Sequence, residues 1–122
     1  MRKYYSQKDE NSEKVYVNGK LKLANVIQDH YSMGRKLDGD AIPLLIRFHV
    51  ESGALPKDST GIYLILTSDD VEEEYRLGGA KMCKDYCGYH LTGKFHDGNV
   101  FYYAMVIFDC TQRRLVDQPN AC

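Results

Sequence analysis

The chain lacks tryptophan, has only three prolines among its 122 residues and carries a formal net charge of −1. Because 16 basic and 17 acidic side chains nearly balance, no electrostatic attraction to nucleic acid or to an anionic membrane is expected. Its apolar runs are far shorter than the roughly 18 residues of a membrane span. The sequence also lacks an H-E-x-x-H, a G-x-S-x-G, a Walker and a G-x-G-x-x-G motif. Several common catalytic classes therefore find no support.

Cysteine is sparse and confined to the last third of the chain, at Cys83, Cys87, Cys110 and Cys122. An even number there fits two disulfides in an oxidising compartment, and it equally fits reduced thiols. The first 14 residues, MRKYYSQKDENSEK, contain no apolar core of a signal peptide, which taken alone favours the cytosol. The two indications conflict, and a missing N-terminal portion would reconcile them.

The length and an apolar content of 43% fit one globular domain. Two continuous apolar runs, Ile62–Thr67 and Val100–Asp109, predict strands buried on both faces, with the first in the middle of the sheet. A helix is predicted over residues 38–53, where Asp38 can cap the start, apolar residues recur at helical spacing and Gly53 ends the pattern. Helix, short loop and strand form the second half of a β-α-β crossover, so a small, mixed, largely parallel sheet with a covering helix is expected.

Weaker signals complete this outline. The Asn18-Gly19 pair predicts a hairpin turn within residues 15–26, although the pairing it implies places valines and lysines on one face. Residues 27–37 are interpreted as a crossing loop with Tyr31 and Met33 as buried anchors. Residues 72–99 are interpreted as a long connection. The core is assigned to residues 15–110, between a polar lead-in (1–14) and a polar tail (111–122).

The densest cluster of reactive side chains is the stretch CKDYCGYH from Cys83 to His90. One interpretation is a zinc site made by Cys83, Cys87 and His90, with His96 or Cys110 as fourth ligand. A second is a Cys–His nucleophile pair, for which nothing in the sequence supplies an orienting group. The third, a disulfide in a secreted domain, is the preferred one, so no metal, cofactor or catalytic residue is assigned.

An acidic run, Asp69-Asp70 and Glu72 to Glu74, follows the first apolar strand. Because ligand sites of open α/β sheets lie at the carboxyl ends of strands, a calcium site or a catalytic carboxylate is one interpretation. The preferred alternative is a solvated face in which one aspartate caps a helical turn that begins near Val71. His49 lies on the apolar stripe of the predicted helix and is interpreted as a core or border histidine.

Four segments carry a family pattern when they are taken in chain order. They are Tyr4-Tyr5 followed by Val17–Leu23, DHYSMGRKL at residues 29–37, residues 42–58 ending in SGALPKD, and GIYLILTSDDV at residues 61–71 followed by CKDYCGYH. Together these segments, which span residues 4–108, resemble the phosphate-induced, EXORDIUM-like family of secreted proteins, best known in plant cell walls. The sequence departs from the family at Leu77-Gly78-Gly79 and after Asp109, and the helix that carries a metallopeptidase-like His-Glu pair in some members is absent.

This resemblance implies a partial, metallopeptidase-like (zincin-like) three-layer domain. It implies a non-enzymatic, growth-associated protein that is extracellular or in the cell wall, with disulfide-bonded cysteines and an unidentified extracellular partner. A sheet cut short would expose strand edges, so self-association is expected. Two alternatives stay open. One is a remnant of a zinc-dependent hydrolase that keeps the Cys83, Cys87 and His90 site, and the other is a plain α/β interaction domain with reduced thiols.

Overall fold

The computed structural model describes residues 5–16, 19–75 and 78–107, which contain one helix and eight strands. In chain order they are β1 (Tyr5–Ser6), β2 (Val15–Tyr16), β3 (Lys36–Asp38), α1 (Ala41–Glu51), β4 (Ile62–Thr67), β5 (Glu72–Tyr75), β6 (Ala80–Lys81), β7 (Gly88–Lys94) and β8 (Val100–Ile107). No helix within these ranges is long and apolar enough to cross a membrane.

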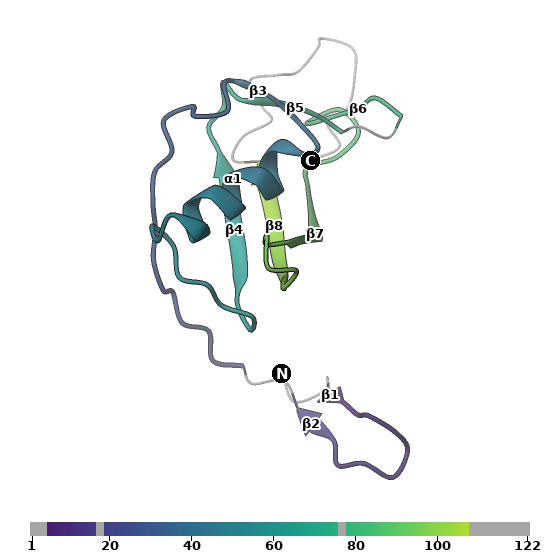
Figure 1. Ribbon diagram of the computed structural model, residues 1–122. Helices are drawn as coiled ribbons and strands as arrows, with labels where there is room; N and C mark the ends of the chain where they lie inside the picture. The colour runs from purple at the N-terminus through teal and green to yellow at the C-terminus, as the bar shows by residue number, and fades with distance from the viewer. Residues whose placement is uncertain (1–4, 17–18, 76–77, 108–122) are drawn as a thin grey trace.

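The main sheet has the strand order β4-β8-β7, and α1 lies in front of it in Figure 1. Strand β8 pairs in parallel with β4 and antiparallel with β7, to which it is joined by a short turn. A second sheet, β3-β5-β6, lies near the carboxyl end of β4. The mixed α/β class and the covering helix are therefore confirmed. The expectation of a largely parallel sheet is wrong, because two of the five strand pairs of the described residues are parallel.

Helix α1 forms where its pattern predicts, and its ends lie within three residues of the expected ones. The Asp38 carboxylate accepts hydrogen bonds from the backbone N–H groups of Asp40 and Ala41, both at 3.0 Å, and so satisfies two donors at the helix start. At the other end Gly53 has a φ of 85° and donates its N–H to the carbonyl of Val50, as expected for a helix C-terminus.

One core lies between α1 and the inner face of the main sheet. The helix contributes Ile42, Ile46 and Val50, and β8 contributes Phe101, Tyr103 and Met105; Ile42, Phe101 and Met105 are completely buried. Ring contacts continue this core, since Phe95 and Phe101 lie 4.6 Å apart between centroids. The alternation of buried and exposed residues along β8 shows that only one of its faces belongs to this core, so the expectation that this second apolar run is buried on both faces is wrong.

The expected place of the first apolar strand is wrong. Strand β4 lies at an edge of its sheet and β8 in the centre. Its outward residues Ile62, Leu64 and Leu66 are 60–70% exposed, so β4 is covered on one face only. A continuous apolar run cannot distinguish a strand buried on both faces from a strand with one uncovered apolar face, which explains the error.

Several weaker expectations also fail. Strand β2 pairs with β1 and not with residues 20–26, where Leu21 and Leu23 are 95% and 80% exposed. The proposed hairpin would have mixed valines and lysines on one face, and the structure avoids this pairing. Asn18 of the predicted turn lies outside the described residues. Tyr31 and Met33 are about 40% exposed and are not buried anchors, and residues 72–99 contain β5, β6 and β7 in place of one long connection.

A close contact between β7 and β8 gives a test of this packing. Gly93 pairs with Phe101, and a Cβ atom added at Gly93 would lie 2.3 Å from the nearest atom of the Phe101 ring. Since Phe101 is completely buried, its ring has little room to move. We predict that Gly93→Ala lowers the free energy of unfolding by about 1–3 kcal/mol in urea denaturation. Thr92→Ala, at the exposed neighbouring position, is the control and should change stability by less than this; equal effects would contradict the packing argument.

Candidate functional site: a buried carboxyl group beyond the end of the sheet

The second part of the acidic run that follows β4, Glu72 to Glu74, lies in strand β5, which alternates between exposed and buried side chains. Glu72 and Glu74 are exposed, whereas Glu73 is 3% exposed. One oxygen of Glu73, Oε1, accepts a hydrogen bond of 2.5 Å from the hydroxyl of Tyr89 on β7. The other oxygen, Oε2, is buried and has no hydrogen-bond partner among the described residues. A buried carboxyl group with one unsatisfied oxygen is energetically costly and therefore marks a candidate site.

Burial raises the pKa of the Glu73 carboxyl above its ordinary value, because the charged form loses its hydration. The hydrogen bond from Tyr89 acts in the opposite direction, and the nearby Asp38 carboxylate adds to the rise. The pKa of the Tyr89 phenol is raised as well, first by burial and then by its hydrogen bond to Glu73. The pair thus favours a protonated phenol beside a carboxyl group that gains a proton more readily than an exposed glutamate.

The same residues connect the second sheet to the main sheet. The backbone carbonyl of Glu73 accepts hydrogen bonds from the N–H of Met82 at 3.2 Å and from the Tyr86 hydroxyl at 3.4 Å. Tyr89 lies edge-on to both Tyr86 and Tyr103, with centroid distances of 5.9 and 6.3 Å. The contacts of Glu73 therefore fasten β5 to the segment that leads into β7. This arrangement can hold or release a proton in a dry environment, and it also holds the two sheets together.

Two parts of the interpretation of the acidic run are wrong. Residues 72–75 form a strand, so the helical turn expected near Val71 is wrong. Asp70 accepts hydrogen bonds from the hydroxyls of Ser68, at 2.6 Å, and Tyr31, at 2.7 Å, which lower the pKa of its carboxyl. The solvated-face interpretation holds for Glu72 but is wrong for Glu73, because strand alternation turns this one side chain inward.

The structure does not bring the predicted cysteine–histidine cluster together. Cys83 is 7% exposed and belongs to the core, and Cys87 lies just before β7. His90 is exposed, and in β7 it lies on the face opposite Tyr89. Within the described residues no group of three His, Cys, Asp or Glu side chains could hold a metal ion. Cys83 is buried and is not a free cysteine, so it is not placed to act as a nucleophile beside His90.

Disulfide pairing stays a prediction. Cys110 and Cys122 lie outside the described residues, and neither described cysteine is free. Cys83 has a φ of 65°, and its N–H donates to the carbonyl of Tyr86 at 2.8 Å, which holds the short 83–86 segment in a tight turn.

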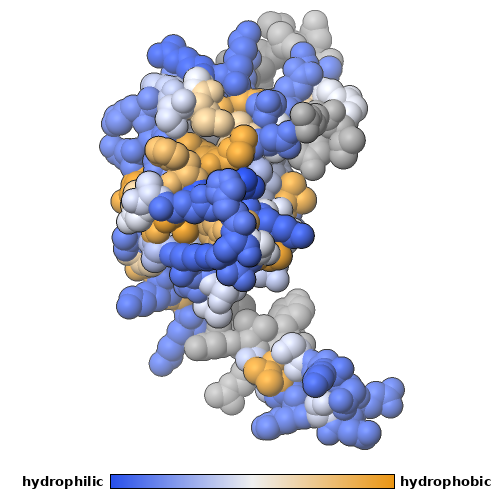
Figure 2. Space-filling view, in the orientation of Figure 1, coloured by the Kyte–Doolittle hydropathy of each residue, from blue (hydrophilic) through white to orange (hydrophobic). Residues whose placement is uncertain are grey.

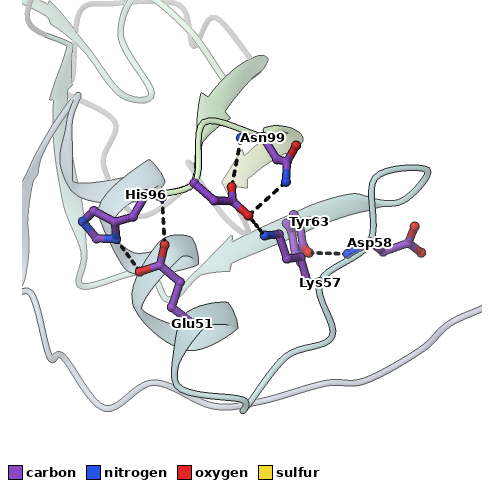
Figure 3. A network of polar contacts seen from close by, with 7 residues as sticks. Glu51, Lys57, Asp58, Tyr63, His96 and Asn99 are labelled. Atoms are coloured by element: carbon purple, nitrogen blue, oxygen red, sulfur yellow. Dashed lines mark hydrogen bonds and ion pairs between the residues drawn. The ribbon is translucent and has the colours of Figure 1, made fainter.

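His96, considered above as a fourth zinc ligand, lies in a different contact (Figure 3). Its backbone N–H donates to Oε1 of Glu51 at 3.0 Å, and its Nδ1 lies 2.5 Å from Oε2 of the same carboxylate. Lys57 forms an ion pair with Asp97. The Asp97 carboxylate also accepts hydrogen bonds from the backbone N–H and the side-chain amide of Asn99. These contacts fasten the end of α1 and the loop after it to the β7–β8 turn. The hydrogen bond from the His96 backbone holds the pKa of Glu51 below its ordinary value.

The sequence did not predict a third polar cluster, at Asp29. Its carboxylate accepts hydrogen bonds from the N–H and the hydroxyl of Ser32, at 2.8 and 2.6 Å, and Nε2 of His49 lies 2.8 Å from Oδ2. Partial burial raises the pKa of Asp29, but the hydrogen bonds from Ser32 and His49 outweigh it and the pKa is lowered. The D-x-x-S spacing is a turn signal that could have predicted the Ser32 contact. The serine faces the aspartate and not the histidine, so the cluster serves to dock the 29–35 loop on α1.

The fold and these contacts define a small mixed α/β domain whose described acid–histidine pairs join segments distant in sequence. A family model described as the phosphate-induced protein 1 conserved region matches residues 1–113. The chain therefore belongs to the phosphate-induced protein 1 family, and the family resemblance drawn from the four ordered segments is confirmed. No curated protein and no solved structure matches the chain.

The buried carboxyl group gives a prediction of pH dependence. Because the folded pKa of Glu73 is raised above its ordinary 4.5, its contribution to stability is fully present below that value and is lost as the pH rises through the folded pKa. Glu73→Gln keeps an oxygen for Tyr89 but cannot ionise. We expect this variant to become more stable relative to the wild-type protein between about pH 4 and about pH 7. The measurement is urea denaturation across that range.

The control for this experiment is Glu72→Gln, since Glu72 is the exposed neighbour on the same strand. Its stability relative to the wild-type protein should vary much less with pH. If the two variants followed the same pH profile, the burial of Glu73 would not be the cause.

Asp29 gives a prediction of opposite sign. Because its folded pKa is lowered from the ordinary 3.8, the stability it contributes is present above that value and is lost as the pH falls through the folded pKa. We predict that Asp29→Asn costs about 1–3 kcal/mol at neutral pH, since it weakens hydrogen bonds to a charged group. The difference from the wild-type protein should shrink below about pH 3 in the same denaturation assay. A difference that is constant down to this pH would show that ionisation of Asp29 contributes nothing.

Proposed function

We propose that this chain acts outside the cell as a non-enzymatic, growth-associated protein of the phosphate-induced type. The observation that carries this proposal is the match of the family model to residues 1–113. The name of the family describes an expression response, so the extracellular place and the growth-associated role are proposed here by resemblance. By the same resemblance we propose that the chain forms part of a three-layer domain similar to that of metallopeptidases (zincin-like).

The contacts of the polar side chains support a role in binding rather than in catalysis. His49 and His96 each pair with a carboxylate from another segment, and both pairs join α1 to a loop. Glu73, the described acidic residue with the deepest burial, joins two sheets through Tyr89. Because these side chains are engaged in contacts that hold the fold together, they are not available to act on a substrate. The proposed activity is accordingly recognition of an extracellular partner by the assembled surface.

Two disulfides among Cys83, Cys87, Cys110 and Cys122 are part of the proposal, because an oxidising compartment favours them. The protein should be isolated from the extracellular fluid of its own host, unfolded without reductant and treated with a thiol reagent. We expect no labelled cysteine before reduction and four afterwards, by mass spectrometry. Cys83→Ser should leave one newly reactive thiol, that of its former partner. Four reactive cysteines in the unreduced protein would contradict the disulfides.

The extracellular location needs a test of its own. The complete gene should be expressed in its host with a small tag, and the tag should be measured in the extracellular fluid and the cell extract, with a cytosolic enzyme as leakage control. We expect the tagged protein to be enriched in the extracellular fraction. Retention with the cytosolic enzyme would contradict this part of the proposal and would favour an α/β interaction domain with reduced thiols.

A further inference from the structure

The main sheet has a second face, opposite α1, that is lined by apolar side chains. We define the outer face as the outward residues of β4 and β8 in three neighbouring rows of the sheet. These residues are Ile62, Leu64, Leu66, Tyr102, Ala104 and Val106. Strand alternation places all of them on the side away from the core residues Phe101, Tyr103 and Met105.

The strand register makes the outer face continuous. Ile62 pairs with Tyr102, Leu64 with Ala104 and Leu66 with Val106, so each row contains two apolar side chains side by side. No charged side chain interrupts these rows on β4 or β8, and on β7 the rows continue with Gly88, His90 and Thr92. The small Ala104 lies in the middle row and leaves room for a side chain from a partner. Face-to-face packing of two sheets requires such an uninterrupted surface.

The exposure of these side chains is high. Leu64 and Leu66 are 60% and 63% exposed, Ile62 is 70%, Tyr102 is 51% and Val106 is 42%. From these fractions the apolar area is on the order of 500 Å², near the upper end of what a monomeric protein normally exposes in one patch. A sheet face of this kind is usually buried against another layer, because each buried aliphatic side chain contributes about 1.5–3 kcal/mol.

A second copy of the chain fits this surface in area and charge. Two outer faces packed on each other would remove about 1,000 Å² from water, which reaches the lower limit for a specific interface. On β4 and β8 the rows carry no charged side chain, and His90 of β7, beside Ala104, is a titratable group that borders the middle row. A two-fold axis lets one apolar patch complement itself. With a formal net charge of −1 per chain, repulsion between two copies is small.

We propose that two copies of this chain associate through their outer faces and form a symmetric dimer in which two sheets pack face to face between two α1 layers. This differs from association through strand edges, in which an unpaired edge of β4 would add another strand and leave the outer face in water. The side chain of Leu64, in the middle row, lies at or near the two-fold axis. Tyr102 contributes from the central strand, which has no free edge.

The test uses the full chain and multi-angle light scattering over a range of concentrations. The wild-type protein is expected to be in a concentration-dependent equilibrium between monomer and dimer. Leu64→Glu and Tyr102→Glu should each weaken the dimer by at least about 30-fold, the size of a loss at a hot spot. Both side chains are exposed in the monomer, so circular dichroism should be unchanged.

The matched control is Phe48→Glu. Phe48 is 62% exposed on α1, on the opposite side of the sheet, where Figure 2 also shows apolar side chains at the surface. This variant should dimerise like the wild-type protein. Three results would overturn the proposal. They are a wild-type protein that is monomeric at all soluble concentrations, open-ended aggregates in place of a dimer, and a dimer that Leu64→Glu weakens but Tyr102→Glu does not. The last result would assign the contact to the edge of β4.

Discussion

The structure depends on the packing of α1 against β8, the central strand of the main sheet. Phe101 and Met105 on β8 are completely buried, as is Ile42 on α1. Because β8 is bonded on both sides, it fixes the places of β4 and β7, and α1 covers the same face of all three. The polar contacts act around this core. Glu51 and Lys57 bind the β7–β8 turn, Asp29 binds α1, and Glu73 binds Tyr89.

The sequence predicted the elements that local pattern determines. The helix could be predicted because apolar spacing, Asp38 and Gly53 all indicate the same span. Both long apolar runs form strands, because a short, continuous apolar run bounded by turn residues is typical of a strand. The order of the strands could not be predicted, because an apolar run carries no information about its neighbours. Strand β4 is therefore at an edge, although its composition is that of a central strand.

The candidate site was predicted only in part. The acidic run was noticed, but nothing in five neighbouring polar residues indicated that Glu73 alone would be buried. That outcome depends on the pairing of β5 with β3 and β6, which brings the inward side chain against Tyr89. The zinc site that was one alternative for the cysteine–histidine cluster is not formed among the described residues, for a related reason. Cys83 and His90 were grouped because they are close in the sequence. In the structure Cys83 is buried, and His90 lies on the exposed face of β7.

The order of pairing along the chain also has a consequence for the rate of folding. Strands β7 and β8 are joined by five residues, so their hairpin can form by local search. Strand β4 pairs with β8 across more than 30 intervening residues. The entropy cost of bringing these two strands together precedes most of the gain from packing α1. We therefore expect the hairpin to form first, and the pairing of β4 with β8 together with the packing of α1 to limit the folding rate.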